Sequence, residues 1–551
     1  MSIGNVSLPL SLLFLLTAAT AWGQDVPSGR AEVVHHQLVV ELDPATHVLT
    51  AQDEVTIHVP GGLRTLTFTL APSLHVDSVA LGGRPHSSGR VQPGASLPYT
   101  TEQLREPSTQ RVVVTLPEAW QRERAVLTWT YHGAINDPPT EPRHLRFVTP
   151  SETAGHIGPE GVYLSSETQW YPDMPGSFSS FAVTAEVPAQ WTVVTQGTLT
   201  QEVLHDGKNV CSWQVRDRSE ALTLVANKFV SKTREWRGPE DQRVQLATFF
   251  FPDNAGLADE YLDATAKYLD AYVSLLGPYP FHKFAVVENF FASGLGMPSF
   301  TLLGSGSIKR HYVQPYALGH EIVHSWIGNS VFNRSDSGNW VEGLTTYLAN
   351  YYWHELSHDA PQAREQRRMM LQGYSLYVSP DRDYPVAQFV RKSDEHDNAI
   401  GYQKAAFIFH LLRHEIGDET FWRGVKKLAT HYKSRSADWT SLEQVFSQES
   451  GKDLRWFFAQ WIEQSGAPVI SLGDVRTSRL PSEATGERWE LTTQIRQASR
   501  PFRVALPLEI TMNDKIESRW ITIDGADTSV KLQLPDRPLR VRLDPEWMTF
   551  R

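Results

Sequence analysis

The chain has 551 residues, of which 41% are hydrophobic and 21% are charged, and its formal net charge is −11. One hydrophobic core rarely serves so long a chain, so we expect roughly two to four domains. The composition excludes an intrinsically disordered protein. The acidic balance argues against nucleic acid as a partner, because phosphate binding needs a concentrated basic face.

The N-terminus has the pattern of an export signal. Residues 8–16 (LPLSLLFLL) form an apolar run that is too short to span a bilayer, and the small-x-small sequence Ala21-Trp22-Gly23 follows it. We therefore expect a signal peptide at 1–23, cleavage before Gln24, and a secreted or periplasmic protein. Residues 1–6 contain no Lys or Arg, so an uncleaved anchor is the alternative. No later segment is long and apolar enough to predict a membrane span.

Strand patterns dominate the first part of the chain. From about 31 to 230, β-branched and aromatic residues alternate with polar ones between Gly, Pro, Asn and Asp breaks. This predicts an all-β domain at 24–230. The single cysteine, Cys211, excludes an intramolecular disulfide, and its surroundings predict a buried strand residue.

The periodicity changes near residue 254. Residues 256–276 place apolar groups at three-to-four spacing, which predicts an amphipathic helix, and 284–304 predicts strand and loop. Helices are then predicted at 315–327, 341–356, 362–377, 402–416, 418–432, 440–449 and 453–464. A mostly helical domain at 231–466 follows from this. Strand patterns return from about 468 and predict a small β-sandwich at 467–551, so the fold class is α+β with several domains.

Residues 320–324 read His-Glu-Ile-Val-His. Two histidines four positions apart lie one turn apart on one helix face, so their ring nitrogens can converge on one ion. A second copy of the pattern begins at His354, but it runs into Asp359-Ala360-Pro361, a helix stop, and has no acidic residue at a suitable distance downstream. We interpret the second copy as a solvated helix terminus.

A third ligand distinguishes the first copy. Glu342 opens the predicted helix at 341–356 and completes a His320, His324, Glu342 set for one zinc ion, since catalytic zinc usually keeps three protein ligands and a water. Glu321 lies beside this set and is placed to take a proton from water as the catalytic base. These residues predict a zinc metallopeptidase that acts on peptides.

The motifs resemble those of the membrane alanyl aminopeptidase family of gluzincin metallopeptidases. HEIVHSWIGNSV followed by WVEGLTTY resembles the family's zinc signature, and Gly401 to Ala406 (GYQKAA) resembles its Tyr-x-Lys-Gly element. The resemblance covers nearly the whole mature chain. It implies a β saddle at the N-terminus, a thermolysin-like catalytic domain, and Tyr402 as the residue that stabilises the oxyanion.

Two departures from the family pattern bear on function. Seventeen residues separate His324 from Glu342, where the usual pattern has eighteen. The family's Gly-x-Met-Glu-Asn strand binds the free α-amine of the substrate through its Glu, but the corresponding stretch here places Gly296 at that position. The implied substrate-binding stretch is Gly294, Leu295, Gly296 and Met297.

The missing carboxylate leaves the substrate class open. An aminopeptidase-like activity is the first hypothesis, with Glu288 or Glu167 as the alternative source of negative charge. An endopeptidase, or a peptidase for blocked N-termini, is the second, because glycine at 296 is also expected to open space at the edge strand. A non-catalytic zinc-binding scaffold is the third, although a scaffold does not need Glu321 and Tyr402. The sequence does not predict the oligomeric state.

Overall fold

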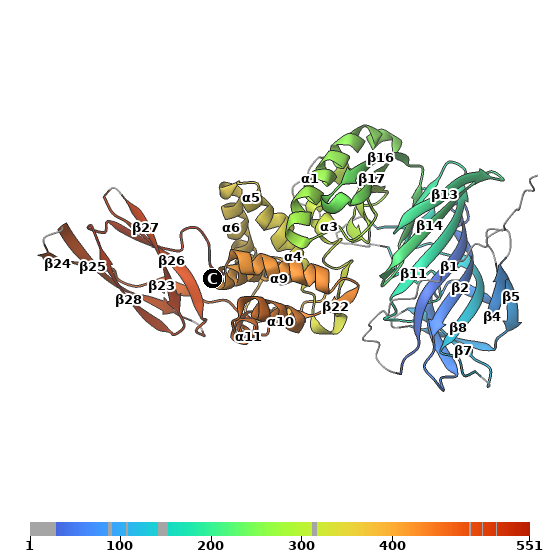
Figure 1. The fold of residues 1–551 in the computed structure, drawn as a ribbon, viewed down its shortest axis with the longest axis horizontal. Helices are drawn as coiled ribbons and strands as arrows, with labels where there is room; N and C mark the ends of the chain where they lie inside the picture. Colours follow the sequence, from blue (N-terminus) through green and yellow to red (C-terminus); the bar gives the residue numbers. More distant parts are fainter. Residues whose placement is uncertain are drawn as a thin grey trace, which may run out of the picture.

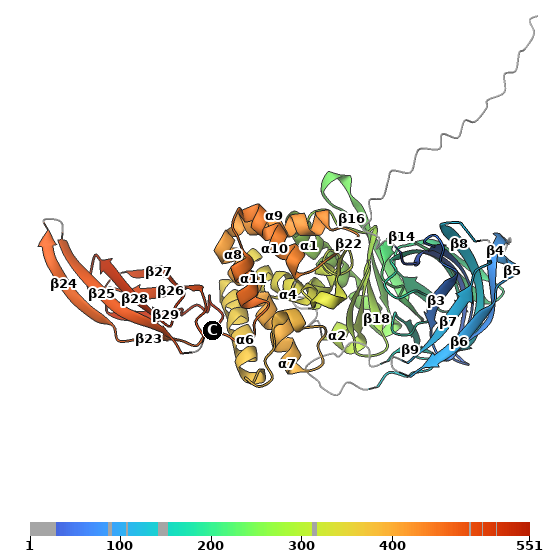
Figure 2. The ribbon, with the colours of Figure 1, turned by 90° about the horizontal axis from the view of Figure 1, so that it is seen from below.

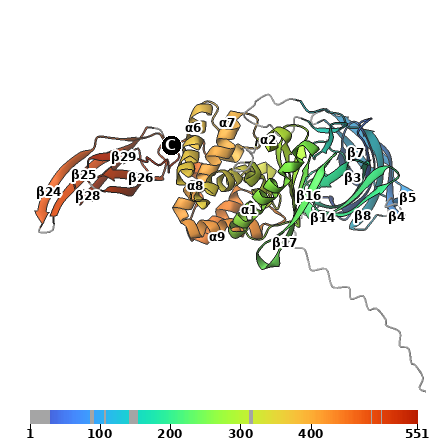
Figure 3. The ribbon, with the colours of Figure 1, turned by 90° about the horizontal axis from the view of Figure 1, so that it is seen from above.

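The computed structural model describes residues 29–85, 91–105, 108–118, 120–140, 153–310, 317–483, 486–498, 500–513 and 515–551. The molecule is elongated, with β-sheets at one end, helices in the middle and the C-terminal strands at the other end (Figures 1, 2 and 3). The predicted signal peptide lies outside the described residues. Within them, no helix is long and apolar enough to cross a membrane.

The N-terminal part consists of three sheets, with strand orders β13-β14-β11-β1-β2-β8-β4-β5, β12-β15-β10-β9 and β3-β7-β6. Its strands are β1 (Glu32–Asp43), β2 (Val48–His58), β3 (Thr65–Leu70), β4 (Leu74–Pro85), β5 (Val91–Ser96), β6 (Tyr99–Leu104), β7 (Thr109–Thr115), β8 (Arg124–Ala134), β9 (Gly155–Gly158), β10 (Gly161–Leu164), β11 (Ser179–Pro188), β12 (Thr192–Thr195), β13 (Thr198–His205), β14 (Lys208–Ser219) and β15 (Leu224–Asn227). Burial alternates along β11 and β14, as expected for strands with one face in a core. Cys211 lies buried in β14, as predicted.

A mixed sheet joins the β-rich end to the helices. Its order is β16-β17-β18-β20-β19, from β16 (Val230–Arg237), β17 (Arg243–Phe250), β18 (Lys283–Asn289), β19 (Gly294–Met297) and β20 (Phe300–Gly304). Helix α1 (Ala258–Leu276) connects the parallel strands β17 and β18, close to the predicted 256–276. All seven residues of β18 are buried, because its two faces contribute to different cores.

Helices follow, in the order α2 (Ser305–Lys309), α3 (Gly319–Val323), α4 (Val341–Thr346), η5 (Tyr347–Tyr352), α5 (Trp353–Leu356), α6 (Ala360–Tyr377), α7 (Glu395–Asp397), η7 (Asn398–Lys404), α8 (Ala405–Ile416), α9 (Asp418–His431), α10 (Trp439–Ser450) and α11 (Arg455–Trp461). Two short strands, β21 (Val331–Asn333) and β22 (Arg435–Ala437), pair in parallel among them. Segments η5 and η7 are π-helical. The predicted single helix at 341–356 is therefore a run of α4, η5 and α5.

The C-terminal strands form two sheets, as predicted. One is built on β25 (Gly486–Gln497), which pairs with β23 (Ile470–Leu472), β24 (Arg476–Glu483) and β28 (Asp527–Leu534). The other has the order β27-β26-β29, from β27 (Ile516–Ile523), β26 (Val504–Thr511) and β29 (Arg540–Leu543). The domain limits at about 230 and 466 stay predictions.

The end of the chain returns to the helical core. Phe550 is buried, with its ring centroid 5.1 Å from that of Tyr374 and 5.4 Å from that of Phe407.

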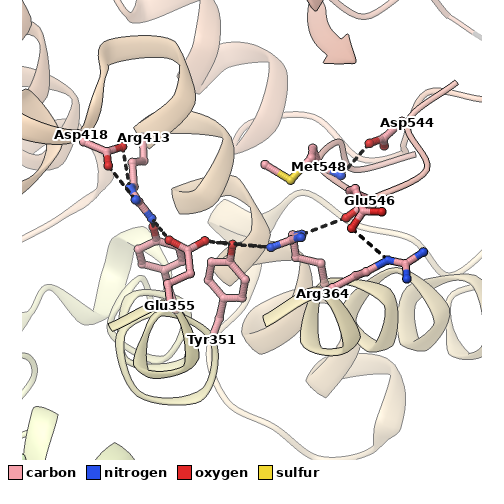
Figure 4. Close-up of polar contacts among 10 residues, drawn as sticks. Tyr351, Glu355, Arg364, Arg413, Asp418, Asp544, Glu546 and Met548 are labelled. Atoms are coloured by element: carbon pink, nitrogen blue, oxygen red, sulfur yellow. Dashed lines mark hydrogen bonds and ion pairs between the residues drawn. The ribbon is translucent and has the colours of Figure 1, made fainter. Parts of the chain in front are cut away.

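A series of polar contacts also holds the C-terminal segment against the helices (Figure 4). Arg367 donates to the Tyr351 hydroxyl over 2.8 Å and to the Glu546 carbonyl over 3.1 Å. Tyr351 in turn donates to Glu355, which pairs with Arg413 over 2.6 Å. The C-terminal strands are thereby fastened to the helices that follow Glu342.

Candidate metal centre and active site

Helix α3 presents His320 and His324 from the middle of the core. Its apolar neighbours are fully or almost fully buried: Leu318, Ile322, Val323, Trp326 and Ile327. The Trp326 indole also donates to the carbonyls of Gly277 and Pro278, over 3.1 and 2.9 Å. These contacts fix the helix against the end of α1, and the two imidazole centroids lie 4.7 Å apart.

Glu342, on the first turn of α4, completes the set. Its Oε2 lies 3.3 Å from His320 Nε2 and 3.5 Å from His324 Nε2. Two ligands about 2.1 Å from a tetrahedral zinc ion lie roughly 3.4 Å apart. The three side chains therefore fit a zinc ion in both chemistry and separation.

The other ring nitrogens are held by the protein. His320 Nδ1 lies 3.1 Å from Asn350 Oδ1, and His324 Nδ1 lies 3.0 Å from the Ile327 carbonyl. Both contacts favour the tautomer with the proton on Nδ1, which leaves Nε2 as the ligand atom. The sequence reasoning missed Asn350, which lies in the π-helical segment η5.

Charge couples the three groups. Burial alone would raise the pKa of Glu342, but the charges and hydrogen bonds of His324 and His320 outweigh burial and lower it. Burial would lower the pKa of His324, but Glu342 raises it to about 9. Since a zinc ligand must be an unprotonated imidazole, zinc would compete with a proton on His324.

Glu321 points from α3 toward strand β19. A Cβ at Gly296 would lie 2.7 Å from Glu321 Oε2 and 3.1 Å from His324 Cβ, whereas at Gly294 the nearest contact would be Glu321 Oε1 at 3.8 Å. The expectation that Gly296 opens space is therefore wrong, because the Glu321 carboxylate and His324 fill it. Burial raises the pKa of Glu321, partly offset by the two histidines.

Tyr402 reaches the same point from η7. Its hydroxyl is hydrogen-bonded to Glu342, and its ring lies 6.3 Å from that of His320. Burial raises the pKa of the phenol well above its ordinary value, and Glu342 adds to this. The hydroxyl therefore stays protonated near neutral pH and is available as a donor.

The two alternative carboxylates differ in their surroundings. Glu288 is buried and accepts from the Phe251 amide over 2.8 Å and from Asn254 Nδ2 over 2.5 Å. Glu167 is exposed; burial is the main cause of the raised pKa of Tyr163, and the charge of Glu167 adds to it. Glu288 is thus engaged by Phe251 and Asn254, whereas Glu167 as a source of negative charge stays a prediction.

The remaining two residues of the predicted substrate strand face away from Glu321. Leu295 and Met297 pack against the N-terminal core, as the alternation of a strand requires. The strand is the edge of its sheet, where an extended peptide can pair.

The second histidine motif has no ligand geometry. Helix α5 ends at Leu356, and His358 is exposed with a φ of +58°. A residue in the left-handed region does not continue a helix, so His354 and His358 do not share a helix face. This confirms the interpretation as a helix terminus.

The short connection between His324 and Glu342 is absorbed in a loop. Gly338 has a φ of +84°, and a Cβ there would lie 2.2 Å from the Ala387 carbonyl oxygen. Trp340, two residues later, is buried and donates to the Ala437 carbonyl over 2.9 Å. The indole therefore fixes the start of α4 against β22.

Comparison with known proteins gives the family. Residues 275–461, which contain the two histidines, Glu321, Glu342 and Tyr402, match the peptidase family M1 domain. The match lies in the helical part of the chain, and together with the aminopeptidase relatives and the M1 structural neighbours it supports an M1 aminopeptidase family. The chain's resemblance to gluzincin aminopeptidases is thereby confirmed.

Relatives of the chain include two fungal enzymes. It is 26% identical to mitochondrial aminopeptidase 2 of Saccharomyces cerevisiae over 321 residues, 55% of this chain and 33% of that protein. It is 29% identical to leucine aminopeptidase 2 of Aspergillus fumigatus over 318 residues, 53% of this chain and 49% of that protein. The chain thus spans between a third and a half of the length of these relatives.

Solved structures share the fold. An M1 zinc metallopeptidase from Deinococcus radiodurans has a TM-score of 0.62 at 19% identity, over 79% of this chain and 94% of that one. Legionella pneumophila aminopeptidase A, in complex with aspartic acid, has a TM-score of 0.70 at 16% identity, over 95% of this chain and 60% of that one. These likenesses confirm the α+β architecture of the chain.

We predict that His324→Ala removes bound zinc and that His358→Asn, in the second motif, does not. His324 supplies one of three ligands, whereas His358 lies beyond a helix end. Zinc content of the purified proteins, measured by plasma mass spectrometry, checks this. Zinc retained by His324→Ala and lost from His358→Asn would place the ion in the second motif.

We also predict that Gly296→Ala keeps zinc but lowers kcat on a fluorogenic peptide by about 10²-fold, a loss typical of a catalytic group misplaced by about 1 Å. The added methyl group would push the Glu321 carboxylate aside. Gly294→Ala is the matched control on the same strand face, and it should lose much less. Equal losses in the two variants would contradict the close-approach argument.

Proposed function

We propose that the chain is a zinc-dependent peptidase of the aminopeptidase type. The observation that carries the proposal is the convergence of His320, His324 and Glu342 beside a buried Glu321. The family supports it, because the matched relatives are named aminopeptidases. A Deinococcus radiodurans M1 zinc metallopeptidase has been solved with a Tyr-Ser-Ala substrate, which supports peptides as substrates.

Each residue of the site has a role in this proposal. Zinc, when held by the three ligands, supplies Lewis acidity toward water and the scissile carbonyl. Glu321 takes the proton of the attacking water and returns it to the leaving amine. Its burial raises its pKa and so strengthens it as a base.

Tyr402 donates its hydroxyl proton in a hydrogen bond to the oxyanion of the tetrahedral intermediate. A single donor of this kind contributes about 3 kcal/mol in other enzymes. The hydrogen bond of the Tyr402 hydroxyl with Glu342 supports this role.

A non-catalytic scaffold is the weaker alternative. Zinc binding alone needs neither a buried carboxylate at 321 nor a phenol at 402. Peptidase activity on blocked or internal sites is the stronger alternative, because position 296 is glycine and Glu288 is engaged by Phe251 and Asn254.

We predict that Glu321→Gln keeps zinc and the fold but lowers kcat by about 10²–10⁴-fold, the usual contribution of a positioned base. The amide is close in size to the carboxylate but cannot accept the proton. Turnover of a fluorogenic peptide, beside zinc content and circular dichroism, checks this. Wild-type turnover would remove Glu321 from the mechanism.

We further predict that N-acetylation of an amino-acyl anilide lowers kcat/KM by less than about tenfold. Capture of a cationic amine in a partly buried cleft needs an opposing carboxylate, and residue 296 provides none. Paired kinetics on free and acetylated substrates decide the matter. If acetylation abolishes cleavage, the enzyme requires a free amine, and Glu288→Ala and Glu167→Ala would identify its anchor.

A further inference from the structure

A lysine lies beside the catalytic residues. Lys392 Nζ lies 4.9 Å from the centroid of the Tyr402 ring, and the side chain is half-buried. The family signature contains no counterpart that would have singled out Lys392 in the sequence. Its position follows from the fold, because the segment 389–392 and the π-helical η7 are adjacent.

The segment that carries Lys392 is held in place. The Phe389 carbonyl accepts from the Asn339 amide over 2.7 Å, and the Val390 carbonyl accepts from Asn339 Nδ2 over 3.2 Å. Phe389 packs directly on Gly401, where a Cβ would lie 2.4 Å from the ring. The lysine is therefore tied to the loop before Glu342 and to the helix of Tyr402.

The charge of Lys392 acts on the reaction centre. Its electrostatic partners are Glu342, Glu321 and Glu395. Burial lowers the pKa of the ammonium group, and the three carboxylates offset part of that effect. A fixed cation therefore lies on the Tyr402 side of the site.

Lys392 adds a positive charge to the site with zinc bound. Zinc and Lys392 would together bring three positive charges against the three carboxylates of Glu321, Glu342 and Glu395. A substrate ammonium would meet no carboxylate at position 296, which is glycine. A substrate carboxylate beside the Lys392 ammonium would meet attraction, which is strong in a partly buried site.

We propose that Lys392 binds a substrate carboxylate next to the scissile bond, either an acidic side chain or the C-terminal carboxylate of a short peptide. This assignment rests on the proposed peptidase function and names its substrate class. The two sources of the carboxylate share one chemistry, so the experiment must separate them. A purely structural lysine, balancing the charges of Glu321, Glu342 and Glu395, is the competing role.

The test uses zinc-loaded enzyme and acetylated peptides in matched pairs, with cleavage followed by mass spectrometry. In the first set, the two peptides of a pair have Glu or Gln at a position next to the scissile bond, on one side of it or the other. In the second set, the two peptides of a pair end in a free C-terminal carboxylate or in a carboxamide. We expect the carboxylate member of one set to have a higher kcat/KM, on the order of tenfold, as for one charge-assisted hydrogen bond. The set that shows the preference identifies the source.

Variants at 392 then assign the preference. Lys392→Gln should bring the ratio of kcat/KM within a pair close to one, Lys392→Arg should keep most of it, and Lys392→Glu should invert it. The ratio is the readout, because a lysine with a structural role alone would change both members of a pair alike. Arg391→Gln is the matched control, since Arg391 is the exposed neighbour and its loss should leave the ratio unchanged.

Failure of the inference can be told from failure of the proposed function. If wild-type enzyme cleaves both members of every pair equally, or if Lys392→Gln keeps the ratio, Lys392 does not bind the carboxylate although the peptidase stands. If no peptide is cleaved, the function fails. Calorimetry of the same pairs with zinc-loaded Glu321→Gln, with and without Lys392→Gln, then decides binding alone. Equal affinities within each pair would overturn the inference.

Discussion

Three ligand atoms from two helices must meet within a few ångströms, and the rest of the catalytic part is arranged around that requirement. A short helix such as α3 has little stability of its own, so its position depends on tertiary packing. Trp326 fixes it to the end of α1, and Trp340 fixes the start of α4 to β22. Each indole is buried and fully hydrogen-bonded, which makes the distance between the helices insensitive to the loop that joins them.

The same requirement explains why strand β19 has two glycines. Glu321 is buried, which suits its proposed role as a base, yet its carboxylate needs space between α3 and the sheet. Gly294 and Gly296 lie on the strand face that meets it, while Leu295 and Met297 pack on the opposite face. Close approach and an amine-binding carboxylate are therefore incompatible at position 296 with this backbone. The glycine at 296 therefore has a structural cause in the close approach of Glu321 and His324.

The sequence patterns predicted those features that depend on neighbouring residues, such as helix periodicity and the spacing of the two histidines. The period of 256–276 and the glycine after it place α1 to within two residues. The four-residue spacing of His320 and His324 predicts that the two histidines bind one metal ion. The two π-helical segments escaped prediction, because an inserted residue in a helix has no local signature. Both carry site residues, Asn350 and Tyr402, in keeping with the frequent occurrence of π-bulges at functional sites. Lys392 escaped for a different reason, since its neighbours are set by tertiary contacts alone.

The docking of the last residues on the helical core has a consequence for the order of folding. Arg367 takes the Glu546 carbonyl as a partner 179 positions later in the chain, and Phe550 fills space beside Phe407 and Tyr374. During synthesis the helices behind Glu342 emerge long before these partners, and contacts of such large sequence separation form late. The core behind the zinc ligands is therefore completed only when the end of the chain has been made. During most of its synthesis the nascent chain therefore lacks the contacts that its last residues make with the helices behind Glu342.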